Sequence, residues 1–162
     1  AEEFGVALVL EGATGAHLVA ERLAQRDVPV VLTGLPAPLD YSGGPARYAR
    51  ADAAAALQRA GVRVYFGSGA VPVPGGAPRL ALRVAPATRA GFAAEAGLVA
   101  LTGGAARLLG VEKKIGRLAT GLQADLGVWS AHPLSPEARV ERVYVGGREV
   151  YRAEGGAEGQ DE

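Results

Sequence analysis

The chain has 162 residues, of which 49% are hydrophobic and 21% charged, a composition typical of one globular domain or slightly more rather than of a disordered protein. Seventeen basic residues balance seventeen acidic ones, and no apolar run approaches the roughly 20 residues that span a bilayer, so we expect neither a nucleic-acid partner nor membrane insertion. The absence of cysteine excludes disulfides, thiolate nucleophiles and cysteine-bound zinc.

Methionine is also absent, even at position 1, and no basic-then-apolar signal segment opens the chain. We therefore expect the chain to be a cleaved or excised part of a longer protein. A processed, cysteine-free chain slightly favours a secreted or cell-envelope protein over a cytoplasmic one.

The first part of the chain predicts strands that alternate with helices. Residues 6–10 (VALVL) form a continuous apolar run, which is typical of a strand covered on both faces in a parallel sheet. A helix is predicted over residues 14–26, with Thr14 as its cap, and residues 28–33 predict the next buried strand. One apolar stripe of the helix contains Ala16, Val19, Ala20 and Leu23.

The same alternation continues as far as residue 66. Residues 34–50 contain too many Pro and Gly for regular structure and predict a long loop. A helix over 51–60 that stops at Gly61 and a strand over 62–66 follow. Three strands with a helix between each pair predict a parallel βαβαβ arrangement, and therefore the α/β class.

A second loop over 67–78 leads to three short helices, of which the first contains Pro86 and is expected to kink there. These helices are predicted near residues 80–90, 93–101 and 105–109.

Beyond Gly110 the pattern changes to short β segments, and the last two are joined by Gly146 and Gly147, a pair suited to a tight hairpin. The β segments are predicted at 124–129, 140–145 and 148–152. The last ten residues offer nothing to bury and are expected to be disordered. We therefore predict an α/β part over 1–110, a β part over 111–152 and a tail over 153–162.

Residues 100–129 (ALTGGAARLLGVEKKIGRLATGLQADLGVW) resemble the C-terminal signature of the amidohydrolase superfamily, in particular its imidazolonepropionase-like and prolidase-like members. In that signature a helix with the pattern A-x-x-x-T-x-x-x-A-x-x-L-G is followed by I-G-x-L-x-x-G-x-x-A-D-L. The matching positions are Thr102, Ala106, Leu109, Gly110, Ile115, Gly116, Leu118, Gly121, Ala124, Asp125 and Leu126.

The resemblance implies a metal-dependent (β/α)8 TIM-like barrel with a small β-sandwich built from both chain ends. This chain would supply about three βα units and the C-terminal strands of that composite sandwich, since a full barrel needs about 250 residues. The matched positions are expected to be structural rather than catalytic. Glycines let the chain turn, and Asp125 is expected to accept backbone N–H groups in that turn. The expected structural positions are Thr102, Gly110, Gly116, Gly121 and Asp125.

The family's metal ligands are mostly missing from this chain. The resemblance places Glu11 where a histidine commonly closes the sixth strand, and Gly69 where an aspartate closes the eighth. Glycine can neither bind a metal nor accept a proton, so the general base of the family is absent. Glu11 has two readings: a carboxylate ligand for a divalent metal, or a residue without a catalytic role.

The remaining candidates are weaker. Thr33 and Ser68 are expected to line the mouth of the barrel, but neither has a histidine base nearby in sequence. His17 is predicted to be a solvated surface residue, and His132 to lie away from any active site. We therefore expect no catalytic residue and no cofactor in this chain, and zinc or another divalent metal only in the complete parent protein.

Two functions follow from the resemblance. The first is the C-terminal part of a metal-dependent hydrolase of C–N bonds, inactive alone, whose partner is the N-terminal half of the barrel or a second copy. That partner is expected because three βα units leave a sheet edge and apolar surface exposed. The alternative is a catalytically inactive homologue that serves as a binding or structural subunit of a larger assembly.

Overall fold

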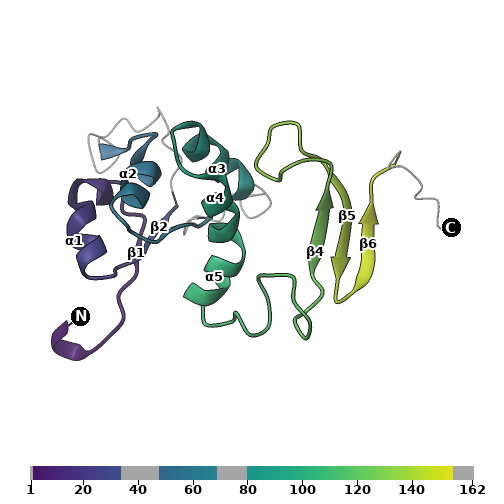
Figure 1. The fold of residues 1–162 in the computed structure, drawn as a ribbon, viewed down its shortest axis with the longest axis horizontal. Coiled ribbons are helices and arrows are strands. Elements are labelled where there is room, and N and C mark those ends of the chain that lie inside the picture. The colour runs from purple at the N-terminus through teal and green to yellow at the C-terminus, as the bar shows by residue number, and fades with distance from the viewer. Residues whose placement is uncertain (1, 34–47, 69–79, 155–162) are drawn as a thin grey trace. The chain divides into compact units, whose positions relative to one another are not determined.

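The computed structural model describes residues 2–33, 48–68 and 80–154, and Figure 1 shows the order of the elements along the chain. The chain divides into two compact units, Ala1–Leu101 and Thr102–Glu162, which we describe separately. Most of the two predicted loops and of the predicted tail falls outside the described residues. None of the described helices is long and apolar enough to cross a membrane.

The first unit contains a three-stranded parallel sheet. Strands β1 (Leu10–Glu11), β2 (Val30–Leu32) and β3 (Val64–Phe66) lie in the order β1-β2-β3. Residue 10 pairs with residue 30, and residue 30 pairs with residue 64. The predicted parallel βαβαβ arrangement and the α/β class are therefore confirmed.

Helices cover one face of this sheet. Val30 and Val64 share that face and are buried, and the ring of Phe66 meets the edge of Phe92 at 5.6 Å between centroids. The largest fully buried side chains of the described residues are Leu57, Val30 and Val84. The elements of this layer are η2 (Ala16–Val19), α1 (Ala20–Gln25), α2 (Ala53–Arg59), α3 (Leu80–Arg89), which contains Pro86, and α4 (Ala94–Leu101).

Helices α1 and α2 end with the same backbone motif. At the end of α2, Gly61 has φ +87° and the N–H of Val62 bonds the carbonyl of Leu57 at 3.0 Å, so the predicted glycine stop is confirmed. At the end of α1, Asp27 takes the equivalent position with φ +49°. Arg63 donates to the carboxylate and to the carbonyl of Asp27, which ties this turn to the start of β3.

The predictions for residues 6–26 need two corrections. The strand covers only residues 10–11, and the preceding apolar segment is exposed after a short turn, η1 (Glu2–Phe4). Only two residues of β1 pair with β2, so the segment before them has no neighbouring strand among the described residues. The helix begins after Gly15 rather than Thr14, and its first turn is a 3-10 helix, which leaves Val19 exposed.

The second unit contains a helix and an antiparallel sheet. Helix α5 (Gly103–Leu108) is followed by strands β4 (Leu126–Trp129), β5 (Val140–Val145) and β6 (Arg148–Arg152), in the order β4-β5-β6. Both glycines between β5 and β6 have positive φ angles, +57° and +78°. The predicted β segments and the glycine hairpin are confirmed.

A carboxylate stabilises the last strand of this sheet. Glu149 accepts two hydrogen bonds from the Arg152 guanidinium, at 2.8 and 3.0 Å, and one from the Tyr144 hydroxyl at 3.0 Å. The Arg152 hydrogen bonds, followed by that from Tyr144, hold the pKa of Glu149 below its ordinary value of 4.5. A carboxylate with a lowered pKa stabilises the folded state above its ordinary pKa, and this contribution disappears as the pH falls through the folded pKa.

We therefore expect the second unit to lose stability as the pH falls below 4.5, and Glu149→Gln to reduce that loss. Urea unfolding followed by the fluorescence of Trp129, the single tryptophan, measures this unit directly. Glu154→Gln removes an exposed carboxylate near the end of β6 and is the matched control. An acid response that is the same in both variants would contradict the assignment to Glu149.

Candidate functional site

The carboxyl ends of the three parallel strands meet at one edge of the sheet, the edge at which parallel α/β folds place their binding groups. Glu11 is the last residue of β1, Thr33 directly follows β2, and Ser68 lies two residues after β3. Two backbone hydrogen bonds of 3.0 Å hold the strand ends in register. The N–H of Gly12 donates to the carbonyl of Val31, and the N–H of Gly67 donates to the carbonyl of Leu32. The structure thus brings the three candidate positions to one edge.

Thr33 is enclosed by glycines of the two neighbouring strands. A Cβ atom built at Gly67 would lie 3.1 Å from the Cγ2 atom of Thr33 and from Cγ1 of Val31, and one built at Gly12 would lie 3.5 Å from the Thr33 hydroxyl oxygen. A side chain at Gly67 would therefore crowd Thr33, whereas one at Gly12 would lie in ordinary van der Waals contact with it. The sequence pattern did not lead us to either glycine. Each glycine directly follows a strand, and this shared position is the signal that could have identified them.

Glu11 lies on the face of the sheet opposite the helices. It pairs with Val31, which pairs with Tyr65, and residues paired in a parallel sheet share a face. Val30 and Val64 pair with each other one position earlier in their strands, and their side chains therefore lie on the opposite, helix-covered face. The Glu11 side chain is exposed, as is that of Ser68, whereas Thr33 is half-buried.

The described residues do not assemble a metal site. Glu11 provides the single carboxylate among the described residues that end or directly follow the three strands. No group of three or more histidine, aspartate or glutamate side chains that could hold an ion occurs within 2–33, 48–68 and 80–154. Gly69, which the sequence places at the family's aspartate position, lies outside the described residues.

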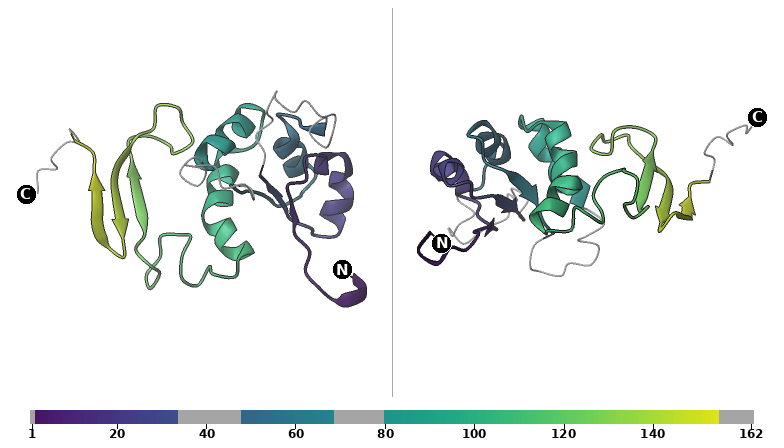
Figure 2. Two further views of the ribbon diagram at one scale, coloured as in Figure 1. Left: turned by 180° about the vertical axis from the view of Figure 1, so that it is seen from behind. Right: turned by 60° about the horizontal axis from the view of Figure 1, so that its bottom comes forward.

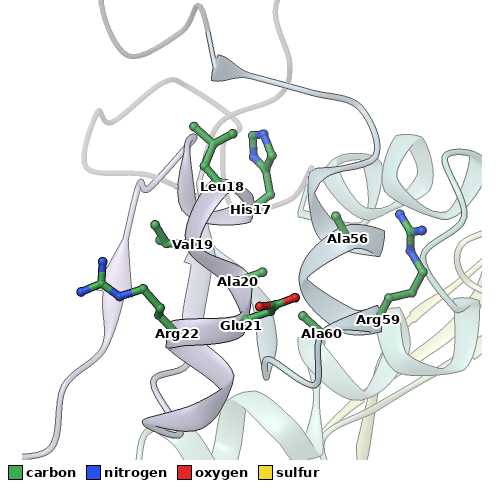
Figure 3. A pocket seen from close by; sticks show the side chains of 9 residues that line it. All are labelled: His17, Leu18, Val19, Ala20, Glu21, Arg22, Ala56, Arg59 and Ala60. Carbon is green, nitrogen blue, oxygen red and sulfur yellow. The ribbon is translucent and has the colours of Figure 1, made fainter.

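A groove of about 650 Å³ lies in the helical layer, between η2–α1 and α2 (Figure 3). Glu21 points across it toward α2, whereas Arg59 points away on the far side of α2 and donates to the carbonyl of Ala55 at 3.3 Å. Its lining residues are His17, Leu18, Val19, Ala20, Glu21, Arg22, Ala56, Arg59 and Ala60.

His17 differs from its prediction as a solvated residue. Its side chain is half-buried in the groove wall, and its Nδ1 atom is shielded from solvent without a hydrogen-bond partner among the described residues. The helical pattern of the sequence could not show that α2 and the residue after it, Ala60, line the same groove as the imidazole. His132 lies in the other unit, where its Nδ1 accepts the N–H of Leu134 at 3.3 Å.

Gly116 packs directly on helix α5. Its φ is +101°, and a Cβ atom there would lie 2.6 Å from the Cβ of Ala106, 3.1 Å from the Cα of Gly103 and 3.2 Å from the carbonyl oxygen of Thr102. A side chain cannot occupy that space without moving the helix. The glycine at this signature position is thus required both by its backbone angle and by the close approach of the loop to the helix.

Asp125 connects the beginning of the sheet to its last hairpin. Its Oδ1 atom accepts the N–H of Gly146 at 2.6 Å, and its Oδ2 atom accepts the Gln123 side-chain amide at 2.7 Å. The N–H of Gly147 bonds the carbonyl of Ala124 at 2.9 Å beside it. The predicted acceptor thus bonds a backbone N–H that lies 21 residues later in the chain rather than in its own turn.

Comparison with known proteins identifies the family. The amidohydrolase family model matches residues 3–150. The solved structure of an amidohydrolase from Thermotoga maritima is 34% identical, with a TM-score of 0.80, and the match covers 94% of this chain and 39% of that one. No curated protein matches the chain.

Two further solved structures share the fold at lower identity. A prolidase solved with N-methylphosphonate-L-proline is 22% identical, with a TM-score of 0.69 and coverage of 94% of this chain and 42% of its own. An adenosine deaminase from Xanthomonas campestris with bound zinc is 24% identical, with a TM-score of 0.59 and coverage of 91% and 38%. The chain thus spans about two fifths of the solved proteins that it matches.

The predicted family is therefore confirmed over most of the chain, and the α/β fold is of the kind related to TIM barrels. The parallel strands, the signature of the second unit and the match over residues 3–150 lead to one conclusion: this chain belongs to the amidohydrolase family.

Proposed function

We propose that the chain is the closing part of a metal-dependent amidohydrolase that hydrolyses C–N bonds outside proteins or in dipeptides, and that it is inactive alone. One observation carries this proposal: in a chain of this family, Glu11, Thr33 and Ser68 lie along the carboxyl edge of a parallel sheet. That edge is where TIM barrels place their reacting groups.

The proposed architecture places β1, β2 and β3 as the last three strands of an eight-stranded barrel. Strands β4, β5 and β6 are then the C-terminal strands of a composite β-sandwich. The parallel order of the first sheet and the antiparallel order of the second support this assignment, as does a match that spans 39% of the Thermotoga maritima protein. The proposed domains remain residues 1–110 and 111–152, followed by a tail over 153–162; α5 then belongs to the barrel part by descent, although it lies in the second compact unit.

The metal ligands of such an enzyme come largely from outside this chain. A catalytic zinc site uses three protein ligands and an open position, whereas the described carboxyl edge offers Glu11 alone as a carboxylate. The remaining ligands are supplied by the N-terminal half of the barrel or by a second copy. Thr33, which keeps its space between two glycines, and Ser68 contact the substrate rather than the metal.

A second candidate function is a catalytically inactive homologue that binds or supports other subunits. Gly69 favours it, because a glycine replaces the aspartate that the family uses as ligand and base. The structural signature of the second unit is compatible with both functions, because it forms the frame of the fold rather than its reacting groups.

The metal content of the complete protein that carries this chain distinguishes the two functions. We expect about one or two zinc ions per protein, measured by elemental analysis, together with hydrolysis of dipeptides or cyclic amides. If Glu11 is a ligand, Glu11→Gln weakens zinc binding by about tenfold or more, whereas Glu21→Gln, in the groove between the helices, leaves it unchanged.

Each outcome has a separate meaning. A complete protein without zinc and without hydrolysis would overturn the enzyme proposal in favour of the structural one. Unchanged zinc binding in Glu11→Gln would remove Glu11 from the ligand set and leave the remaining proposal in place.

A further inference from the structure

The groove between η2–α1 and α2 has no part in the proposed function, because it lies in the helical layer rather than at the carboxyl edge of the sheet. Figure 2 shows α1 and α2 side by side. Ala20 lines one side of the groove, and Ala56 and Ala60 line the other. Its volume of about 650 Å³ falls in the range of small-molecule sites. The groove thus provides an apolar slot that an aliphatic chain can fill.

Glu21 gives this slot a negative charge. Its side chain points across the groove toward α2, whereas the guanidinium groups of Arg22 and Arg59 point away on the outer sides of the two helices (Figure 3). Within the part of the chain that the structure describes, no ion pair or hydrogen bond engages the Glu21 carboxylate. A carboxylate beside an apolar slot and without a cation of its own attracts an ammonium group.

His17 provides a second polar group in the same groove. Its Nδ1 atom is shielded from solvent without a hydrogen-bond partner among the described residues, whereas Nε2 is not shielded in this way. A shielded N–H without an acceptor is rarer than a shielded acceptor without a donor, so we place the proton of the neutral imidazole on Nε2. Figure 3 shows the ring at the end of the groove where η2 begins. The imidazole thus has one N–H to donate to a molecule in the groove.

The donor and the carboxylate lie at different points along the groove. His17 and Glu21 are four residues apart across η2 and α1, which corresponds to about 7 Å along the helix axis. We propose that the groove binds an aliphatic amino acid whose ammonium and carboxylate groups lie at opposite ends of its chain. The ammonium group binds Glu21, the carboxylate accepts the Nε2 hydrogen of His17, and the methylene groups lie against the alanines.

Other classes of ligand fit this groove less well. A zinc ion takes three or more protein ligands, and the described residues contain no such group of histidine, aspartate and glutamate. Glu21 repels a simple anion, and a simple amine leaves the Nε2 hydrogen of His17 unpaired. The inference is independent of the proposed function, because binding in the helical layer requires neither a metal nor hydrolysis.

A set of related small molecules tests the two ends of the site separately. The probe for the full chain is δ-aminovalerate, and pentylamine and valerate each keep only one of its charged groups. Nuclear magnetic resonance titration measures binding through the amide signals of Ala20, Ala56 and Ala60. We expect δ-aminovalerate to bind about fivefold or more tightly than either comparison, because each of them lacks one polar contact. The shorter β-alanine cannot reach both groups and is expected to bind no better than pentylamine.

Substitutions at the two polar groups are expected to act on different ligands. Glu21→Gln weakens the binding of δ-aminovalerate and of pentylamine by about fivefold or more and does not weaken that of valerate. His17→Phe keeps an aromatic ring without its nitrogens, and it weakens δ-aminovalerate and valerate but not pentylamine. Glu3→Gln removes an exposed carboxylate from η1 and is the matched control, with no effect on any of them. Circular dichroism checks that each variant keeps the melting temperature of the natural chain.

Ala60→Leu provides a second test that leaves both polar groups in place. Its larger side chain fills the groove from the end of α2, and it is expected to abolish the binding of δ-aminovalerate. Three results would overturn the inference: no binding of δ-aminovalerate, equal binding of pentylamine, or equal effects of Glu21→Gln and Glu3→Gln. None of these measurements involves zinc or hydrolysis, so their failure leaves the proposed function in place.

Discussion

Replacing Gly116 by alanine is expected to destabilise the second unit by roughly 2–4 kcal/mol, the sum of a disfavoured backbone angle and an overpacked contact. The new methyl carbon would begin 2.6 Å from the Cβ of Ala106, and the neighbouring contacts at 3.1 and 3.2 Å are backbone atoms that cannot rotate away. Urea unfolding followed by Trp129 fluorescence reports on this unit alone, because Trp129 is the single tryptophan and lies in β4.

Gly121→Ala is the control for this prediction. Gly121 has a similar positive φ, +85°, but nothing lies within 4 Å of a Cβ atom there. Its replacement by alanine is therefore expected to lower the free energy of unfolding by about 1 kcal/mol, from the disfavoured backbone angle alone. Adding Ala106→Gly to Gly116→Ala removes the nearest clash and is expected to restore part of the loss. Equal losses for Gly116→Ala and Gly121→Ala would show that the contact with α5 contributes nothing.

Leu57→Ala is expected to destabilise the first unit by about 2–5 kcal/mol, the usual cost of truncating a fully buried leucine. Leu57 is 0% exposed on α2, and its carbonyl accepts the N–H of Val62, which leads into β3. A cavity there is expected to weaken the packing of α2 against β3, the strand that precedes Gly67 and Ser68. The unfolding midpoint in urea, measured by far-UV circular dichroism, checks the size of the effect.

Leu18→Ala provides the comparison, because Leu18 is 61% exposed at the rim of the groove in the same unit. We expect that substitution to change the free energy of unfolding by no more than about 0.5 kcal/mol. If both leucines cost the same, Leu57 does not form the centre of the core and the carboxyl edge does not depend on it.

The residues that fix the fold and the candidate site residues lie in different parts of the chain. The Gly116 contact and the Asp125 hydrogen bonds fix the loop and the sheet of the second unit, where the family signature is concentrated. The candidate reacting positions lie at strand ends of the first unit, outside the signature stretch of residues 100–129. A complete signature therefore shows the family of the chain without showing that its site is active.

The sequence by itself determined the local elements and the family. Parallel strands, the glycine stop at Gly61 and the Gly146–Gly147 hairpin could be predicted because each depends on neighbouring residues: apolar runs, positive φ angles and turn chemistry. The spacing of the signature between residues 100 and 129 identified the amidohydrolase family for the same reason, because it is a pattern within one short stretch.

Tertiary structure alone decided which distant groups meet. The hydrogen-bond partner of Asp125 lies 21 residues away, and Thr33 lies beside two glycines that follow other strands. The imidazole of His17 lies in the wall of a groove that α2 helps to form. The exposure of residues 6–9 is likewise invisible in an apolar run, because burial depends on what lies beside a strand rather than on the strand itself. Spacing along the chain fixes local conformation, whereas contacts between distant segments depend on how the strands and helices pack in three dimensions.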